Sequence, residues 1–325
     1  MAQLRAAVTL SLTGDYAVQA HQARTGLDVW AEQDDVRLYV LDDAGSGPVA
    51  LAAYRGFIAG DYDILLGPYS SGLVRRVGAT VCGAGRLLWN HGGAADDVAR
   101  PGVVSVLAPA STYLQPLLRV ALDRGAEAVL LVRGTGKFAR QVIEGARQEA
   151  AALGLPVSVA GLGEVGAWQA SDSLAGRAVL IAGTFEQDVV ALQRLRTAGS
   201  EVGVVGCVAA GIREFGARLG GLADGVLGPA QWACRDRPAE IGPAGTVFAR
   251  RFEARTGRMP DYPAAQAAAT GWLAAEAVRR EMGAGEVHRW RTSTLLGSFA
   301  LNASWRQVGY SPVVVQWRHG RLEPL

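Results

Sequence analysis

The feature that most constrains the fold is a regular alternation of short β-branched runs with longer segments of helical periodicity. Strands are expected at residues 6–12, 36–41, 62–67, 86–90 and 103–108. Between the first two lies a segment, 16–32, in which Tyr16, Ala20, Ala23, Leu27 and Trp30 recur at helical spacing. Strands that alternate with amphipathic helices are typical of parallel sheets covered by helices, so the predicted class is α/β.

The same pattern then begins again. Further strands are expected at 126–133, 157–160, 179–183, 202–206 and 225–227, with helices at 113–123, 138–153, 186–197 and 213–219. A chain of 325 residues exceeds the usual size of one hydrophobic core. We therefore predict two Rossmann-like lobes, each a parallel sheet flanked by helices.

The last third of the sequence fixes how the lobes are divided. Helices at 244–255 and 263–281 have no new strand between them, so they should cover an existing sheet. The tail is expected to form a strand pair from 298–303 and 312–317. With crossings near 111–113 and 229–237, the predicted lobes are residues 1–112 plus 235–290 and residues 113–234 plus 291–325.

Composition excludes several classes of protein. The formal charge is +2, from 32 basic and 30 acidic residues without a basic run, which argues against a nucleic-acid partner. No run of about 18 apolar residues is present, so no membrane span is expected. The start runs within a few residues into the first strand, which leaves no room for a signal peptide. Either a leader has been removed from a periplasmic or otherwise extracytoplasmic protein, or the protein is cytoplasmic.

Motifs for chemistry are weak. Gly134-Thr-Gly-Lys-Phe-Ala139 follows an expected strand and opens a helix, as a dinucleotide fingerprint does, but the acidic residue that should hold the ribose is displaced to Glu164. His91 lacks a second histidine at ligand spacing, and with its neighbouring aspartates it is expected to be a solvated loop group. Asp42-Asp43 is expected to cap or pair locally. We predict no catalytic residue, metal or cofactor, and a nucleotide-dependent enzyme stays an alternative.

The order and spacing of several segments resemble the branched-chain amino-acid binding proteins, which have the type I periplasmic binding protein fold. These segments are Leu12-Thr-Gly-Asp-Tyr-Ala17, Leu41-Asp-Asp43, Leu66-Gly-Pro-Tyr-Ser-Ser71, Leu88-Trp-Asn-His-Gly-Gly-Ala-Ala95 and Phe252-Glu-Ala-Arg-Thr-Gly-Arg-Met-Pro260. The resemblance covers nearly the whole chain. It implies a clamshell of two lobes that holds a small molecule between them without reacting with it.

The resemblance also implies where the first lobe holds a ligand carboxylate. Ser71 matches the family's anchoring serine, and Ser70 and Tyr69 precede it at the start of a helix, where N–H groups favour an anion. The alternative is that both serines only cap the helix. In the next loop, Gly92 and Ala94 match positions that present backbone groups to the ligand.

Other candidate contacts depend on how this sequence departs from the family. The family often has a threonine at the position of Ala94, so Asn90 or Trp89 could supply the missing contact. That segment could equally be a plain glycine-rich turn. Tyr16 and Trp232 are further aromatic candidates near the loops, although core packing is the alternative for each.

The second lobe departs more strongly. Phe138 stands where many relatives have a tyrosine, and Val208 stands where they have the acid that pairs with the ligand's ammonium group. Glu186 or Gln187 could replace that acid, the alternative being an exposed first turn of a helix, and Phe185 could line the pocket. A ligand without an ammonium group would suit such a site, because burying an unpaired cation is costly.

The resemblance therefore predicts the solute-binding component of an ABC transporter, with a small amino-acid-like, amide or carboxylate ligand and a permease as partners. One alternative is a cytoplasmic sensor of amide-type ligands that regulates a partner protein. The other is the nucleotide-dependent enzyme considered above.

Overall fold

The computed structural model describes residues 3–164, 174–197 and 202–325 and divides the chain into two compact units. Unit 1 comprises Met1–Pro109 and Gln231–Tyr310, and unit 2 comprises Ala110–Ala230 and Ser311–Leu325. The chain therefore passes from one unit to the other three times.

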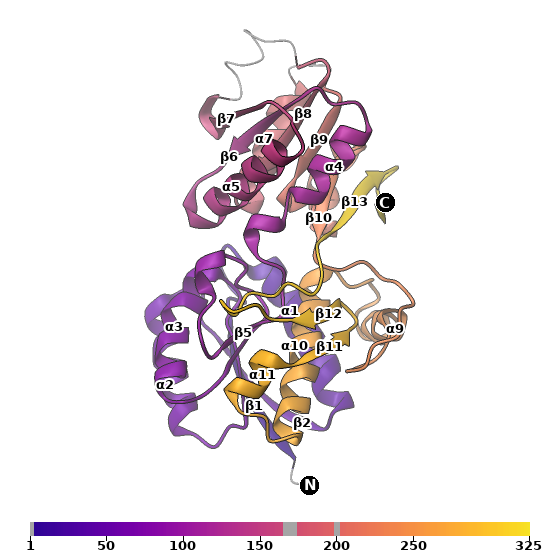
Figure 1. Ribbon diagram of the computed structural model, residues 1–325. Coiled ribbons are helices and arrows are strands. Elements are labelled where there is room, and N and C mark those ends of the chain that lie inside the picture. Colours follow the sequence, from indigo (N-terminus) through magenta and orange to yellow (C-terminus); the bar gives the residue numbers. More distant parts are fainter. Residues whose placement is uncertain (1–2, 165–173, 198–201) are drawn as a thin grey trace. The chain divides into compact units, whose positions relative to one another are not determined.

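Unit 1 is built on a parallel sheet with the strand order β2-β1-β3-β4-β5. Figure 1 labels β1, β2 and β5 of this sheet. Its strands are β1 (Leu4–Leu10), β2 (Val36–Asp42), β3 (Ile64–Leu66), β4 (Leu88–Asn90) and β5 (Val103–Ser105). Side chains alternate between the two faces of each strand. In β1, Ala6 and Val8 face one core and Ala7 faces the other. The sheet is therefore covered on both sides.

Helices from both ends of the chain cover this sheet. They are α1 (Ala17–Gln33), α2 (Gly47–Ala59), α3 (Ser71–Gly83), α9 (Gly245–Thr256), α10 (Tyr262–Arg279) and α11 (Ala284–Arg289). One core contains residues of α1, α9 and α10, and the other contains residues of α2 and α3. Glycines let α1 and α10 approach closely, since a Cβ on Gly26 would lie 2.2 Å from the Ala264 carbonyl oxygen. In the predicted helical stripe, Ala20 and Trp30 are fully buried, whereas Tyr16 is 40% exposed.

Unit 2 has the strand order β14-β13-β10-β9-β8-β6-β7, parallel from β7 to β10 and antiparallel at β13 and β14. Its strands are β6 (Ala128–Arg133), β7 (Val157–Gly161), β8 (Arg177–Ala182), β9 (Val204–Cys207), β10 (Leu227–Ala230), β13 (Val313–Arg318) and β14 (Arg321–Pro324). Its helices include α4 (Gln115–Asp123), α5 (Gly136–Ala152), α7 (Phe185–Thr197) and α8 (Arg213–Leu219). The predicted α/β class, with parallel sheets flanked by helices, is confirmed.

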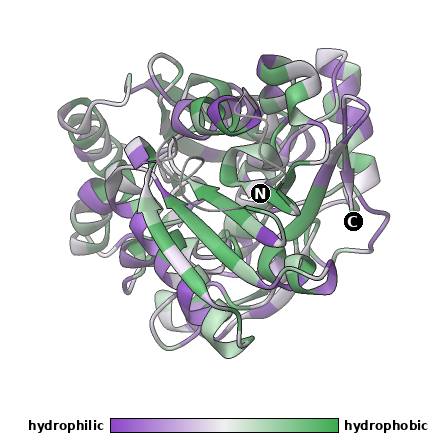
Figure 2. Ribbon diagram, turned by 90° about the horizontal axis from the view of Figure 1, so that it is seen from above, coloured by the Kyte–Doolittle hydropathy of each residue, from purple (hydrophilic) through white to green (hydrophobic). Residues whose placement is uncertain are grey.

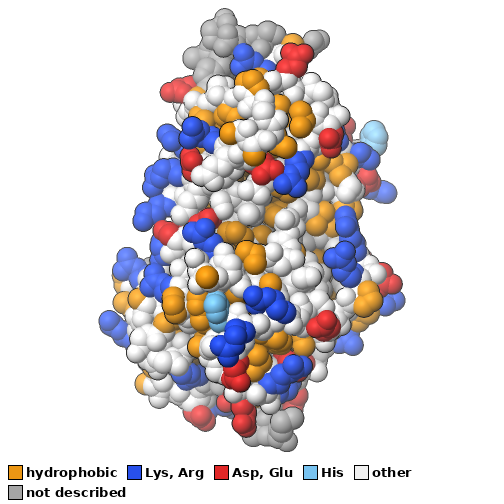
Figure 3. All heavy atoms as spheres, in the orientation of Figure 1, with side chains coloured by type: hydrophobic (Ala, Val, Ile, Leu, Met, Phe, Trp, Pro, Cys, Tyr) orange, Lys and Arg blue, Asp and Glu red, His pale blue; other side chains and the backbone are white. Residues whose placement is uncertain are grey.

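Hydrophobic residues are concentrated in the strands, which is why the sheets are buried beneath the helices. Figure 2 shows hydrophobic residues along the strands, while the helices carry hydrophobic and hydrophilic residues side by side. On the face drawn in Figure 3, basic and acidic side chains are interspersed. Within the described part of the chain, no helix combines the length and hydrophobicity needed to cross a bilayer.

The expected pairing of the tail strands is wrong. β12 (Gly297–Ala300) pairs with β11 (Arg291–Thr294), whereas β13 pairs with β10 and β14. The two predicted tail strands thus pair with other strands and not with each other. The choice of a strand partner depends on which edge is available in the folded sheet, which local pattern does not encode.

Residues 291–310 also belong to unit 1, although the sequence prediction placed them in the second lobe. The β11–β12 hairpin is held there by the loop before α9, because Ile241 N–H donates to the Ser293 carbonyl oxygen at 3.0 Å. The Thr292 hydroxyl donates to Glu240 at 2.8 Å. The third crossing therefore comes after Tyr310 rather than before Arg291.

Candidate functional site

The amino end of α3 forms one part of the candidate site. Ser70 caps the helix, as the alternative interpretation expected, since its Oγ accepts the N–H of Leu73 at 3.2 Å and its carbonyl oxygen accepts that of Val74 at 3.0 Å. The first N–H groups of a helix have no partner within the helix. Among the described residues, no acceptor is found for the N–H groups of Ser71 and Gly72. Two donors therefore remain at the positive end of the α3 dipole.

Ser71 connects this helix end to the loop after β4. Its Oγ accepts the N–H of Ala95 at 2.9 Å. The hydroxyl hydrogen of Ser71 is not used in that bond and can still be donated. No acceptor for the N–H of the neighbouring Ala94 is found among the described residues. The predicted residues Ser71 and Ala94 are thus brought together, with donors that can serve an anion.

Asn90, a predicted ligand contact, is bonded to groups of its own loop and of β5. It is fully buried, and its amide nitrogen donates to the Gly93 carbonyl oxygen at 2.8 Å and to the Ser105 Oγ at 2.9 Å. Its side-chain oxygen accepts the N–H groups of Gly92 at 3.2 Å and Gly93 at 2.8 Å. The N–H of Gly92, also a predicted ligand donor, is therefore already used. Asn90 fixes the shape of the loop from inside.

Three of the four aromatic candidates of unit 1 belong to its hydrophobic core. Trp89, Trp232 and Tyr69 are 2%, 6% and 8% exposed, and core packing is the alternative that the sequence left open for each. The ring centroid of Tyr69 also lies 6.5 Å from that of Tyr16, which is 40% exposed. Burial, with the charge of Asp15 as a lesser cause, raises the pKa of the Tyr16 hydroxyl. Tyr16 and Tyr69 are the aromatic candidates beside Ser70 and Ser71.

His91 is not the solvated loop residue that we expected. It is fully buried, and its ring centroid lies 6.1 Å from that of Tyr69. Burial lowers the pKa of its imidazole to about 4, against a smaller opposing effect of the Gly67 carbonyl. His91 is therefore neutral at physiological pH.

The acidic residues near these loops have structural partners. Asp96 pairs with Arg306 at 3.4 Å and Asp97 with Arg75 at 2.7 Å. Asp43 accepts hydrogen bonds from the hydroxyls of Thr9 and Ser11, which agrees with the expected local role. No cluster of three or more metal-ligating side chains occurs in the described ranges.

The candidates of unit 2 lie on α5 and α7. The ring of Phe138 packs edge-on against Tyr113, with centroids 5.5 Å apart. Phe185 is partly buried against the core of this unit. The side chain of Glu186 is 63% exposed and pairs with Arg218 at 2.9 Å, an arrangement typical of the exposed first turn that was the alternative for it. The role of Glu186 as a replacement for the family's acid stays a prediction.

The side chain of Gln187, on α7, bonds to the turn at residues 134–139 that resembles a dinucleotide fingerprint. Its side-chain oxygen accepts the N–H groups of Thr135 and Thr184, each at 3.1 Å, and its amide nitrogen donates to the Thr135 hydroxyl at 2.7 Å. A Cβ on Gly134 would lie 2.5 Å from the Gln187 oxygen. The side chain of Gln187 thus fills the space beside Gly134 and uses the N–H of Thr135, both of which a bound phosphate group would need.

Asp188 is a buried acid that sequence reasoning did not single out. It is fully buried at the start of α7 and accepts the N–H of Ala209 at 2.9 Å. Burial raises the pKa of its carboxyl to about 8, with opposing effects from N–H groups that include that of Ala209. Helical spacing was the missed signal, because Asp188, Leu192 and Leu195 share the inward face of α7.

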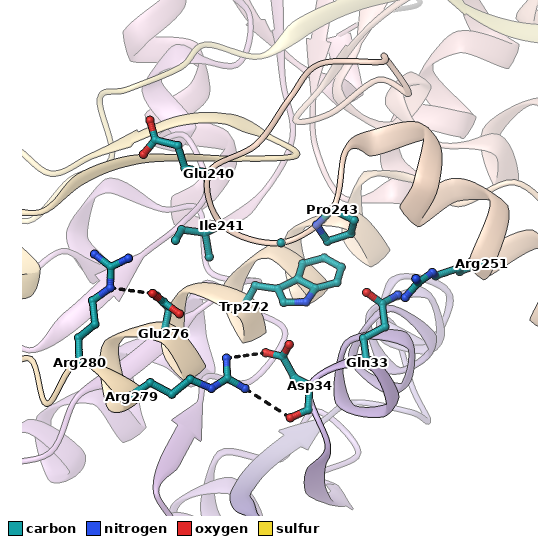
Figure 4. Close-up of a pocket in the computed structure, with 11 residues that line it drawn as sticks. Gln33, Asp34, Glu240, Ile241, Pro243, Arg251, Trp272, Glu276, Arg279 and Arg280 are labelled. Atoms are coloured by element: carbon teal, nitrogen blue, oxygen red, sulfur yellow. Dashed lines mark hydrogen bonds and ion pairs between the residues drawn. The ribbon is translucent and has the colours of Figure 1, made fainter. Parts of the chain in front are cut away.

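A cavity of about 380 Å³ lies in another part of unit 1. Figure 4 shows the residues that line it. Its walls come from the end of α1, the loop before α9, and the helices α9 and α10, and none of the predicted site residues lines it. Arg279 pairs with Asp34 at 3.3 Å, and Arg280 pairs with Glu276 at 2.7 Å. The lining residues are Gln33, Asp34, Glu240, Ile241, Gly242, Pro243, Arg251, Trp272, Glu276, Arg279 and Arg280. Because much of its charge is paired internally, we place the candidate site at α3 and not here.

Comparison with solved structures shows the same fold in several solute-binding proteins. A leucine-binding protein from Thermotoga maritima has a TM-score of 0.86 at 14% identity, over 99% of this chain and 97% of that one. The branched-chain amino acid transporter substrate-binding protein of Streptococcus pneumoniae, in complex with isoleucine, has a TM-score of 0.84 at 13% identity, over 100% and 99%. A solute-binding protein from R. palustris, in complex with benzoate, has a TM-score of 0.77 at 15% identity, over 100% and 96%.

No curated protein sequence matches this chain. A family model described as periplasmic binding protein matches residues 3–292, which is most of the chain. The members that resemble it in structure are substrate-binding proteins and not enzymes. The chain therefore belongs to the periplasmic binding protein family, and it has the type I fold that the resemblance implied.

Proposed function

We propose that this chain is the solute-binding component of an ABC transporter and binds a small carboxylate or amide at the amino end of α3. The observation that carries the proposal is the set of hydrogen-bond donors at Ser71, Gly72 and Ala94. A ligand oxygen would accept from these N–H groups and from the Ser71 hydroxyl. The α3 dipole adds a favourable interaction with a negative charge.

A ligand without an ammonium group fits the described residues better than a free amino acid. Val208 is apolar and nearly buried where relatives place an acid, and Glu186 already pairs with Arg218. Asp188 is fully buried and bonded to Ala209. An ammonium group held without an acid would lose much of its hydration without compensation. The benzoate complex of the R. palustris protein supports this class of ligand, because benzoate has a carboxylate and no amine.

The transporter role rests on the family. The S. pneumoniae and R. palustris relatives are named as binding proteins of transporters, so we propose that this protein works outside the cytoplasm and presents its ligand to a permease. Tyr16 and Tyr69 would contact the apolar part of the ligand. Phe138 and Phe185 of unit 2 stay predicted contacts.

Calorimetric titration tests the ligand class. Benzoate, benzamide and leucine should be titrated separately into the purified protein, and we expect benzoate or benzamide to bind at least tenfold more tightly than leucine. Tight leucine binding would contradict the assignment of an ammonium-free ligand. Turnover of any of these compounds would contradict a binding role altogether.

The variant Ser71→Ala tests the position of the site. Loss of a hydroxyl that donates to a charged carboxylate should weaken binding about tenfold or more. Ser46→Ala is the matched control, because Ser46 caps α2 by accepting from Val49 N–H and lies on a different helix. Equal affinities of the two variants would place the ligand elsewhere.

A further inference from the structure

The three connections between the units begin or end at residues that are bonded to one another inside unit 1. The connections follow Pro109, precede Gln231 and follow Tyr310. These positions are far apart in sequence. Hydrogen bonds nevertheless join residues at all three connections, namely Val106 and Ala108 at the first, Gln231 at the second and Tyr310 at the third.

Gln231 joins the first connection to the second. Its amide is buried, with 1% of the residue exposed. The side-chain oxygen accepts the N–H of Ala108 at 2.9 Å, and the side-chain nitrogen donates to the carbonyl oxygen of the same residue at 3.1 Å. The backbone of Ala108 offers one donor and one acceptor, which fixes the orientation of the amide.

Tyr310 joins the third connection to the other two. Its hydroxyl lies 3.0 Å from the Gln231 side-chain oxygen and 3.2 Å from the Val106 carbonyl oxygen. The hydroxyl has a single hydrogen, so these two acceptors share it. Burial raises the pKa of Tyr310 far above its usual value, so the hydroxyl remains protonated and able to donate.

We propose that Gln231 and Tyr310 couple the three connections, so that the connections loosen together as a single joint and not one by one. Buried hydrogen bonds of this kind are costly to break, because each lost partner leaves a polar group unsatisfied away from water. The coupling is a property of this chain's own residues and does not depend on which ligand is bound. It assigns positioning roles to Gln231 and Tyr310.

Hydrogen exchange of the intact protein, followed by mass spectrometry, tests the coupling without any ligand. Three segments are compared: residues 106–112, 228–234 and 308–313. Gln231→Met keeps the length of the side chain and removes its hydrogen bonds. We expect exchange in all three segments to become about tenfold faster, including the two that do not contain the substitution.

Tyr310→Phe provides a second variant that keeps the ring, so the test stands even if Gln231→Met does not fold. It should accelerate exchange in the first two segments by about threefold. Tyr54→Phe is the matched control, because Tyr54 is a fully buried tyrosine of unit 1 whose hydroxyl donates to the Leu66 carbonyl oxygen. It should lower the global stability without a selective change at the connections.

Two results would overturn the proposal. One is faster exchange confined to the segment that carries the substitution, which would make the role of each residue local. The other is an equal change in Tyr54→Phe, which would make it a general loss of stability. Neither result depends on the calorimetric titrations, so the two proposals can fail separately.

Discussion

The two units end their parallel strands with similar loops but use the polar groups of those loops differently. In unit 1, the amide of Asn90 holds its loop from a fully buried position, and the donors at Ser71, Gly72 and Ala94 are left without acceptors in the described part of the chain. In unit 2, the amide of Gln187 lies over the turns themselves and accepts the N–H groups of Thr135 and Thr184. An amide side chain thus leaves the donors at Ser71, Gly72 and Ala94 available in unit 1, whereas in unit 2 an amide side chain uses the N–H groups of Thr135 and Thr184.

This difference shows why a glycine-rich turn before a helix is weak evidence for a phosphate or nucleotide site. The turn at Gly134 has the right spacing, yet a side chain from α7 accepts the N–H of Thr135 and fills the space beside Gly134. The helix end at Ser71 has no such motif, yet it keeps its donors. What decides is whether a neighbouring element provides an acceptor.

The largest expected effect is that of removing the buried amide. Asn90→Ala would leave the N–H groups of Gly92 and Gly93 and the hydroxyl of Ser105 without a partner, at a cost of about 4 kcal/mol in the free energy of unfolding. Gln187→Ala is the matched comparison and should cost only about 1 kcal/mol, because water can reach the groups it leaves. Chemical denaturation measures both. Equal losses would mean that the two loops do not differ in burial.

The next prediction concerns the pH dependence of the free energy of unfolding, which Asp188 gives to unit 2. Asp188 has a folded pKa of about 8, above its ordinary value, so the folded state binds a proton that the unfolded state releases. The stabilisation that this bound proton provides is therefore fully present below the pKa of the unfolded state and is lost as the pH rises towards 8. Between pH 6.5 and 8 this amounts to about 2 kcal/mol.

The variant Asp188→Asn should abolish that slope, since Asn keeps an acceptor for the Ala209 N–H and cannot ionise. Thermal unfolding of both proteins at the two pH values measures it. Cys207 faces Asp188, and burial raises the pKa of its thiol well above the ordinary value, so the thiol stays neutral in this range. His91 contributes little there, because its lowered pKa affects stability mainly below pH 6.5. An identical slope in the variant would show that Asp188 is ionised in the folded protein.

The smallest expected effect concerns the exposed acid. Glu186→Gln should change the free energy of unfolding by no more than about 0.5 kcal/mol, because its ion pair with Arg218 is exposed to solvent. It should leave the affinity for benzoate or benzamide unchanged in calorimetry. Glu144→Gln is the control, since Glu144 pairs with Arg147 at a similarly exposed position on α5. A tenfold loss of affinity in Glu186→Gln alone would make Glu186 a ligand contact.

The sequence by itself determined the α/β class, the order of most strands and helices, and the place of Ser71 at the start of a helix. These features depend on local periodicity and on capping residues, which act within a few positions. Only the tertiary structure decided the partners of the tail strands, the place of residues 291–310, the bond of Asn90 to Ser105, the bond of Gln187 to Thr135, and the meeting of Gln231 with Tyr310. Each of these depends on groups distant in sequence that compete for the same donors and acceptors, and that competition is settled only when the chain is packed.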